Sequence, residues 1–155
     1  MPRKRPGALR AEQSLRVARG LPPQRIHGLS ARTSAAIDRV EMLSGDYYVC
    51  PGATDGALRR YRAFLQAPGR RPLYPQDAEC SCRGCSLDDV RHARDVLEEV
   101  MQQLPTWPRA QLERQVRELD ARYVERTLPD PFAAERQWRS DLWWRCRLSG
   151  GREGG

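Results

Sequence analysis

Apolar residues recur at steps of three and four along much of the chain, which is the spacing of a helix that buries one face. Only residues 47–50 combine the aromatic and β-branched character of a strand, and Pro51-Gly52 ends that stretch at once. The pattern therefore predicts a mostly α fold. The expected helices lie near residues 33–44, 54–66, 87–104, 108–126 and 132–148.

The third of these helices carries the strongest signals. Ser86 and Asp89 form an S-x-x-D capping signature ahead of an apolar stripe that begins at Val90. A short proline-containing link separates this helix from the next, and two helices so joined pack antiparallel. We expect a small helical domain built on an antiparallel helical hairpin, preceded by a cysteine-containing loop.

Length and composition are those of one small domain. The chain has 155 residues, 39% of them hydrophobic, which leaves no room for two independent cores. No apolar run approaches the roughly 18 residues needed to cross a bilayer, and no apolar signal core follows the N-terminus. We expect a cytoplasmic protein that does not contact membranes.

Charge is distributed very unevenly along the chain. Residues 1–32 hold eight basic residues and one acid, whereas residues 33–155 hold 19 of each, so the net charge of +7 lies in an N-terminal arm. Gly20, Pro22-Pro23 and Gly28 interrupt this arm, which we expect to be largely disordered. Residues 149–155 are expected to form a disordered tail.

A basic arm indicates an anionic partner, because arginines that neutralise phosphates release counterions and give affinity without reading sequence. Nucleic acid is the natural candidate. The alternative is a solvated tail whose arginine content follows from a G+C-rich genome, since no aromatic residue interleaves with the arm's basic residues. The candidate nucleic-acid-binding residues are Arg3, Lys4, Arg5, Arg10, Arg16 and Arg19.

Three of the five cysteines cluster as Cys80, Cys82 and Cys85. In a reducing compartment clustered thiols more often bind metal or take part in redox chemistry than form structural disulfides. Cys82-x-x-Cys85 has the spacing of a zinc knuckle, with Gly84 allowing the tight turn, and Cys80 can add a third sulfur.

The fourth zinc ligand is not determined by spacing, because no second C-x-x-C exists. Cys50 is favoured over His92 and Cys146, since a ligand there would tie the proline-rich connector to the hairpin. Two alternatives stand beside structural zinc. The cysteines can be free thiols, or Cys85 can be a redox thiol with its pKa lowered by the helix start and Arg83.

Three of the four tryptophans fall within seven positions near the C-terminus. One interpretation is that these indoles fold across the hairpin as core residues. The other is a Trp/Arg interface for a protein partner, formed by Trp138, Trp143, Trp144 and Arg145.

Catalytic motifs are missing from the sequence. It contains no P-loop, no G-x-G-x-x-G, no H-E-x-x-H and no G-x-S-x-G, and its carboxylates are scattered over helix faces. We therefore expect a protein that is not an enzyme.

Parts of the chain resemble small proteins of actinobacteria whose genomes have a high G+C content. The resemblance rests on CSCRGCSLDDVRHARDVLEEV from Cys80, LERQVRELDARYVERTLPDPF from Leu112, and the closing pair Trp143-Trp144. Some of those proteins accompany mobile elements, and their function is uncharacterised, so the resemblance implies a setting and no activity.

Together these features predict an accessory or regulatory protein, of a mobile element such as a plasmid, that contacts nucleic acid non-specifically and holds a structural zinc. The alternatives are a protein-interaction adaptor that uses the Trp/Arg face, and a thiol redox sensor.

Overall fold

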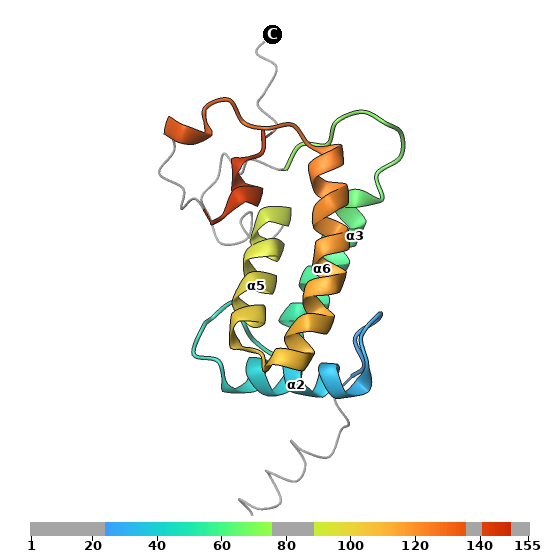
Figure 1. Cartoon of the computed structure of the whole chain (residues 1–155), viewed down its shortest axis with the longest axis vertical. Coiled ribbons are helices and arrows are strands. Elements are labelled where there is room, and N and C mark those ends of the chain that lie inside the picture. The colour runs from blue at the N-terminus through green and yellow to red at the C-terminus, as the bar shows by residue number, and fades with distance from the viewer. Residues whose placement is uncertain (1–23, 76–88, 136–140, 150–155) are drawn as a thin grey trace, which may run out of the picture.

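The computed structural model describes residues 24–75, 89–135 and 141–149, which form a helical body (Figure 1). Within these ranges an isolated bridge between Pro129 and Arg147 is the one β pairing, and no strand forms. The mostly α class is thus confirmed. The helices are α2 (Ala31–Leu43), α3 (Ala53–Leu65), α5 (Val90–Gln103) and α6 (Thr106–Arg126), with 3-10 turns η1 (Ala133–Glu135) and η2 (Trp143–Cys146).

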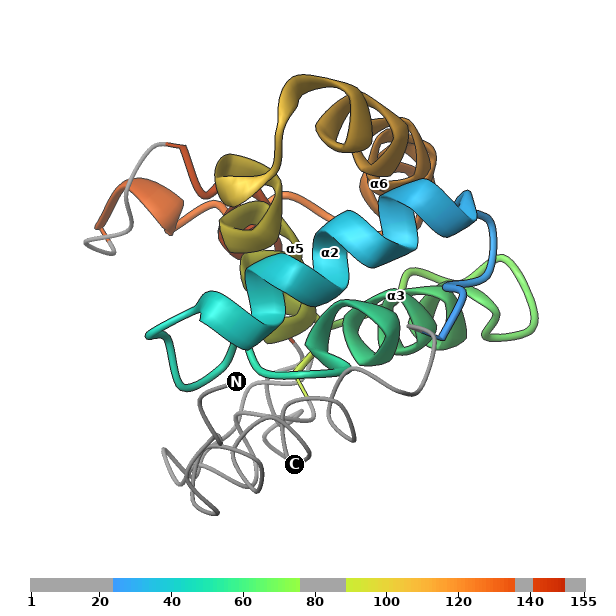
Figure 2. The same ribbon diagram turned by 90° about the horizontal axis from the view of Figure 1, so that it is seen from below.

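Helix α2 lies across the end of the body where α5 joins α6, as two perpendicular views show (Figures 1 and 2). Helices α5 and α6 run in opposite directions on either side of Leu104 and Pro105 (Figure 1). However, α5 packs more extensively against α3 than against α6. The apolar face of α5 is broad enough to meet both helices, so the core is not a simple hairpin seam.

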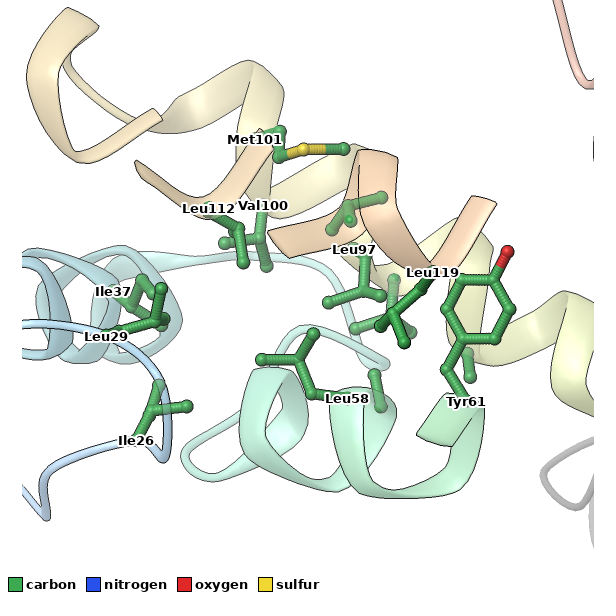
Figure 3. Close-up of a cluster of buried hydrophobic side chains, with 14 of the residues drawn as sticks. Ile26, Leu29, Ile37, Leu58, Tyr61, Leu97, Val100, Met101, Leu112 and Leu119 are labelled. Carbon is green, nitrogen blue, oxygen red and sulfur yellow. The ribbon is translucent and has the colours of Figure 1, made fainter. Parts of the chain in front are cut away.

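Side chains from all four helices meet in one core (Figure 3). Leu58 of α3, Leu97 of α5 and Leu112 of α6 have no exposed surface. Burial of a leucine side chain contributes about 1.5–3 kcal/mol relative to exposure. These contacts, rather than helix propensity, hold the body together.

The segment before α2 belongs to this core and not to the basic arm. Ile26 and Leu29 are 7% and 1% exposed, and the Leu29 N–H donates to the Ile26 carbonyl at 3.1 Å. Gly28 between them has φ +83°, a conformation that favours glycine. The arm boundary expected at residue 32 is therefore too late, and the rest of the arm, residues 1–23, lies outside the described ranges.

Helix α2 also begins earlier than expected. Ser30 is its N-cap, and its hydroxyl accepts from the Thr33 N–H at 3.1 Å. Thr33 and Ser34, at the expected start of the helix, lie buried in its first turn. The Ser34 hydroxyl instead accepts the Ile26 N–H at 3.0 Å and so fixes the incoming chain.

The N-cap residue of helix α3 provides no side-chain hydrogen bond to the first turn. This N-cap, Gly52, has φ +87°, and Thr54, at the expected helix start, is fully buried one residue into the helix. The carboxylate of Glu41 on α2 caps the helix instead. It accepts the Gly52 N–H at 2.8 Å and the Thr54 N–H at 3.2 Å. A carboxylate at a helix N-terminus is favoured by the helix dipole.

Helices α5 and α6 start close to where the pattern places them. Asp89 is the N-cap of α5 and accepts the Arg91 N–H at 2.8 Å, so the helix begins at Val90 rather than near 87. Ser86 lies outside the described residues. Helix α6 includes Pro108 in its first turn, where the missing N–H has no intrahelical partner to lose.

The helix expected over 132–148 does not form in the described parts of that stretch, which hold η1 and η2 instead. The Asp130 N–H donates to the Cys146 carbonyl at 2.9 Å, and the Leu148 N–H donates to the Leu128 carbonyl at 2.7 Å. The Leu148 N–H, which a helix ending at residue 148 would donate to a carbonyl four residues earlier, thus donates to a distant segment instead.

Candidate functional site

The structure brings three of the four proposed interface residues together on η2, packed against α5. They are Trp143, Trp144 and Arg145. Trp138 lies outside the described residues.

Trp144 is a core residue. Its side chain is 2% exposed, its indole Nε1 donates to Asp95 Oδ1 at 2.7 Å, and its ring lies 4.2 Å from the guanidinium carbon of Arg94. Its carbonyl accepts the Tyr123 hydroxyl at 3.0 Å. With its polar atom paired inside the body, this indole offers nothing to a partner.

Trp143 and Arg145 are less deeply placed. Trp143 is half-buried, edge-on to Tyr123 with ring centroids 6.1 Å apart. The guanidinium of Arg145 forms an ion pair with Asp95 on α5. The carboxylate that holds Trp144 therefore also holds Arg145, and the segment is anchored to α5 by one acidic residue.

A buried ion-pair network joins α3, α5 and α6. Arg94 donates from Nε and Nη2 to the Asp120 carboxylate at 2.9 and 3.1 Å, and from Nη1 to Glu98 at 2.9 Å. The Tyr61 hydroxyl donates to the same Asp120 carboxylate at 2.8 Å. We define these four residues as the Arg94 network.

Sequence reasoning missed this network, although a signal was present. Arg94 stands four residues after Val90 and three before Leu97, which places a charge on the apolar stripe of α5. A charge at such a position needs a partner inside the fold. The apolar spacing does not show which acidic residue is the partner of Arg94.

Burial and the Asp120 carboxylate raise the pKa of Tyr61 above its ordinary value, and burial likewise raises the pKa of Tyr123. Burial alone would lower the pKa of Arg94, but its hydrogen bonds to Asp120 and Glu98 outweigh burial and raise it. Both phenols therefore stay protonated donors and Arg94 stays a cation. The network is suited to holding helices together rather than to moving protons.

A cleft of about 280 Å³ opens beside this network, between α5 and α6. Arg109 lines it and donates from Nη2 to the Gln102 carbonyl at 2.7 Å. Its charged lining alternates in sign, with Glu98, Glu113 and Asp120 against Arg94, Arg109 and Arg117. The cleft therefore has no net preference for an anion or a cation.

His92 lines another cleft, of about 330 Å³, together with Asp46 and Glu99. Its ring meets Tyr48 edge-on, with centroids 4.8 Å apart. Burial lowers the pKa of His92 below its ordinary value. The aromatic contact makes this histidine part of the packing between α5 and the loop that follows α2.

Of the proposed zinc ligands, only Cys50 falls in the described residues, because Cys80, Cys82 and Cys85 lie outside them. Cys50 is an exposed free thiol in the turn before α3. Cys146 is half-buried, with its sulfur 3.9 Å from the Leu142 carbonyl. Among the residues that the structure describes, no group of three or more His, Cys, Asp or Glu side chains has the geometry to hold a metal.

The six proposed nucleic-acid-binding residues, Arg3, Lys4, Arg5, Arg10, Arg16 and Arg19, also lie outside the described ranges. Two further arginines of the expected arm are placed. The Nε of Arg25 donates to the Leu29 carbonyl at 3.1 Å, and the guanidinium of Arg32 lies 5.3 Å from the Trp107 ring centroid. Both side chains thus contact the folded body.

A second basic region lies around the C-terminal end of α3. From Gly56 to Pro75 the chain carries five arginines and no acid. Arg122 and Arg126 reach the same place from α6 and donate to the carbonyls of Leu65 and Ala67. We define the basic end as four arginines at this place: Arg70, Arg71, Arg122 and Arg126.

Comparisons with protein-family models, with curated proteins and with solved structures found no match. No helix in the described ranges combines the length and apolar character that a membrane span requires. The described residues thus define a small helical domain, and its function has to be argued from its own chemistry.

Proposed function

We propose that this protein is a non-enzymatic accessory or regulatory protein that contacts nucleic acid non-specifically through its N-terminal residues. One observation carries the proposal, namely the concentration of most of the charge excess in residues 1–23. With Arg25 and Arg32 assigned to the body, residues 1–23 hold six basic residues against the single acid Glu12.

The rest of the chain has little charge of its own to attract a polyanion. Residues 24–155 carry 21 basic and 19 acidic residues. Several of these arginines are neutralised inside the body, as Arg94 is by Asp120 and Arg91 by Asp89. A phosphate backbone would therefore meet most of the unbalanced charge on the arm.

Salt dependence of binding tests this proposal. Each phosphate neutralised on duplex DNA contributes about −0.9 to the slope of log K against log salt. Replacing Arg3, Arg5, Arg10 and Arg16 with glutamine should flatten the slope by about 3–4 and weaken binding at low salt. Fluorescence anisotropy with a labelled 20-bp duplex measures both quantities.

A matched control uses four exposed arginines of the body that lie outside the basic end, changed to glutamine at Arg39, Arg59, Arg114 and Arg117. This variant has the same net charge as the arm variant. The duplex slope should change clearly less in the control than in the arm variant. Equal slopes in the two variants would mean that total charge, and not the arm, governs binding, and the proposal would then fail.

Ile26 is the first core residue among those that the structure describes, so we expect that the arm can be removed without disturbing the core. A chain that begins at residue 24 should keep its thermal midpoint while losing most duplex affinity. Loss of folding in this truncated chain would show that residues 1–23 are part of the body.

The proposal includes a structural zinc held by Cys80, Cys82, Cys85 and Cys50. The knuckle spacing supports it, and Cys50 is exposed on the turn before α3, where its thiol is open to a ligand. Zinc would tie that turn to the cysteine loop ahead of α5.

Native mass spectrometry with and without chelator tests for the metal. The freshly reduced protein should carry one zinc, and Cys82→Ser should lose it and melt at a lower temperature, whereas Cys146→Ser should retain it. Reduced protein without zinc, together with an unchanged melting temperature for Cys82→Ser, would exclude the site.

The link to a mobile element rests on the resemblance of the cysteine and hairpin stretches to actinobacterial proteins.

A further inference from the structure

A groove of about 490 Å³ lies beside the C-terminal half of α3. This volume falls in the range of about 300–1,000 Å³ that is typical of small-molecule pockets. Its walls come from α3, from the loop that follows it and from the first residue of α5. The lining residues that the structure describes are Arg60, Ala63, Phe64, Ala67, Leu73, Tyr74 and Val90.

The loop wall of the groove is held in place by α6. The Leu73 N–H donates to the Arg126 carbonyl at 2.7 Å, and Arg126 in turn donates to the Ala67 carbonyl at 3.3 Å. Two hydrogen-bonded contacts therefore fix the loop between α3 and Tyr74. Figure 1 shows this loop beside the C-terminal end of α6.

Two aromatic rings line the groove. Phe64 is half-buried and rests against Tyr123, with ring centroids 5.9 Å apart. Tyr74 is 46% exposed. One ring is thus supported from behind and the other presents much of its surface to solvent, which suits a flat aromatic ligand.

The charge around the groove favours an anionic ligand. None of the described lining residues is a carboxylate. Arg122 and Arg126 are hydrogen-bonded to neutral carbonyl oxygens, which leave their positive charge in place. Arg70 and Arg71 are exposed on the loop. A flat apolar ligand with attached negative charge is the chemistry that matches both features.

We propose that this groove receives an unpaired nucleobase of a single-stranded nucleic acid, stacked on Tyr74, while the basic end contacts the neighbouring phosphates. A duplex keeps its bases stacked inside, so only a single strand can offer one to the groove. An apolar peptide would fill the groove but would leave the arginines unmatched. The inference rests on the proposed function and adds a preference for single strands to the arm's non-specific contact.

Comparison of two labelled 12-mers isolates the base. One is a thymidine oligonucleotide, and the other is an abasic deoxyribose phosphate chain with the same number of phosphates. Because stacking of one base on an aromatic side chain is worth roughly a factor of ten in affinity, the full chain should bind the thymidine 12-mer about tenfold tighter than the abasic one.

Variants of Tyr74 carry the test. Tyr74→Ala should bring the two affinities together, and Tyr74→Trp should preserve or widen the difference. Tyr47→Ala is the matched control, because Tyr47 is 70% exposed and does not line the groove. It should leave the ratio unchanged. Thermal midpoints of the three variants check that each is folded.

The basic end should act on both oligonucleotides alike. Arg70→Gln combined with Arg71→Gln should weaken the two 12-mers by the same factor and reduce the salt slope by about 1–2. A uridine 12-mer measured in parallel identifies the natural source, since tighter binding than thymidine assigns the groove to RNA and weaker binding assigns it to DNA.

The inference is overturned if the intact protein binds the abasic and thymidine 12-mers equally, or if Tyr74→Ala leaves their ratio unchanged. In either case arm-dependent duplex binding can persist, and the proposed function stands without the groove. If the intact protein binds neither 12-mer nor duplex at low salt, the proposed function fails as well.

Discussion

The interior of the body and the end of α3 use arginine in opposite ways. Inside, Arg94 donates to the carboxylates of Asp120 and Glu98, and the ion pairs are largely buried. At the basic end, Arg122 and Arg126 donate to main-chain carbonyls. The interior cancels its charge, whereas the basic end keeps it.

This difference teaches that arginine content alone says little about function. A buried guanidinium that lacks a carboxylate is strongly destabilising, so the interior positions are constrained by folding. An arginine bonded to a carbonyl keeps a full positive charge near solvent and can attract an anion. The partners of each arginine, rather than the number of arginines, therefore determine which of them can attract an anion.

The largest expected effect comes from breaking the interior. Asp120→Ala removes the acceptor shared by Arg94 and Tyr61 and should lower the free energy of unfolding by about 3–5 kcal/mol. Urea denaturation monitored by circular dichroism measures the loss. Glu118→Ala, at an exposed site on the same helix, is the control and should change stability by less than about 0.5 kcal/mol. Similar midpoints for the two variants would contradict a structural role for the Arg94 network.

A smaller effect is expected where the C-terminal segment is anchored. Asp95→Ala removes the carboxylate that accepts from the Trp144 indole and from Arg145 and should cost about 1–3 kcal/mol. Tryptophan emission should shift to longer wavelength as the indole gains water. Glu99→Ala on the same helix, whose carboxylate accepts from exposed Gln103, should leave the emission unchanged. An unshifted spectrum for Asp95→Ala would mean that packing alone holds the segment.

The free energy of unfolding should depend weakly on pH because of His92, a half-buried residue at the edge of the core. Burial lowers the pKa of His92, opposed by Asp95 and Asp89 and assisted by Arg60 and Arg145. The unfolded chain, with the ordinary histidine pKa of about 6.5, therefore takes up its proton first as pH falls. Stability should decline from about pH 6.5 downward through the folded-state pKa. His92→Gln should flatten this decline in urea midpoints measured across pH, and parallel curves for the two proteins would refute it.

The smallest effect on stability is expected at the basic end. Arg122→Gln removes an exposed guanidinium whose partner is the Leu65 carbonyl, 3.4 Å away, and should change the unfolding free energy by less than about 0.5 kcal/mol. Its affinity for the abasic 12-mer should nonetheless fall. A loss of stability comparable with that of Asp120→Ala would remove the distinction between the two regions.

The existence of α2, α3, α5 and α6 was predictable because the apolar spacing is a local property of the chain, whereas the helix expected over 132–148 does not form in its described parts. The stripe from Val90 to Leu104 and the cap at Asp89 place α5 to within a few residues. The cap of α3 was not predictable in the same way, although its start was expected to within one residue. Its cap comes from Glu41, which lies 11 and 13 residues from the two N–H groups it accepts. Only packing of α2 against the turn brings that carboxylate there.

The candidate sites likewise divide into those visible in the sequence and those that only folding forms. The charge excess of residues 1–23 and the cysteine spacing are visible in the sequence, and both remain proposals. The groove at Tyr74 is invisible there, because its walls come from α3, the following loop and Val90. The tryptophans allowed two interpretations from the sequence, core residues or a surface for a partner, and the structure places Trp144 in the core.

By itself the sequence determined that the chain forms amphipathic helices, where most of them begin and end, and which terminus carries the charge excess. Tertiary structure decided that Ile26 and Leu29 join the core, that α5 packs mainly on α3, and that Arg94 meets Asp120. The physical reason is the separation along the chain over which each feature is set. Periodicity, caps and charge are set within a few residues, whereas the partner of a buried charge and the walls of a groove depend on segments that only folding brings together.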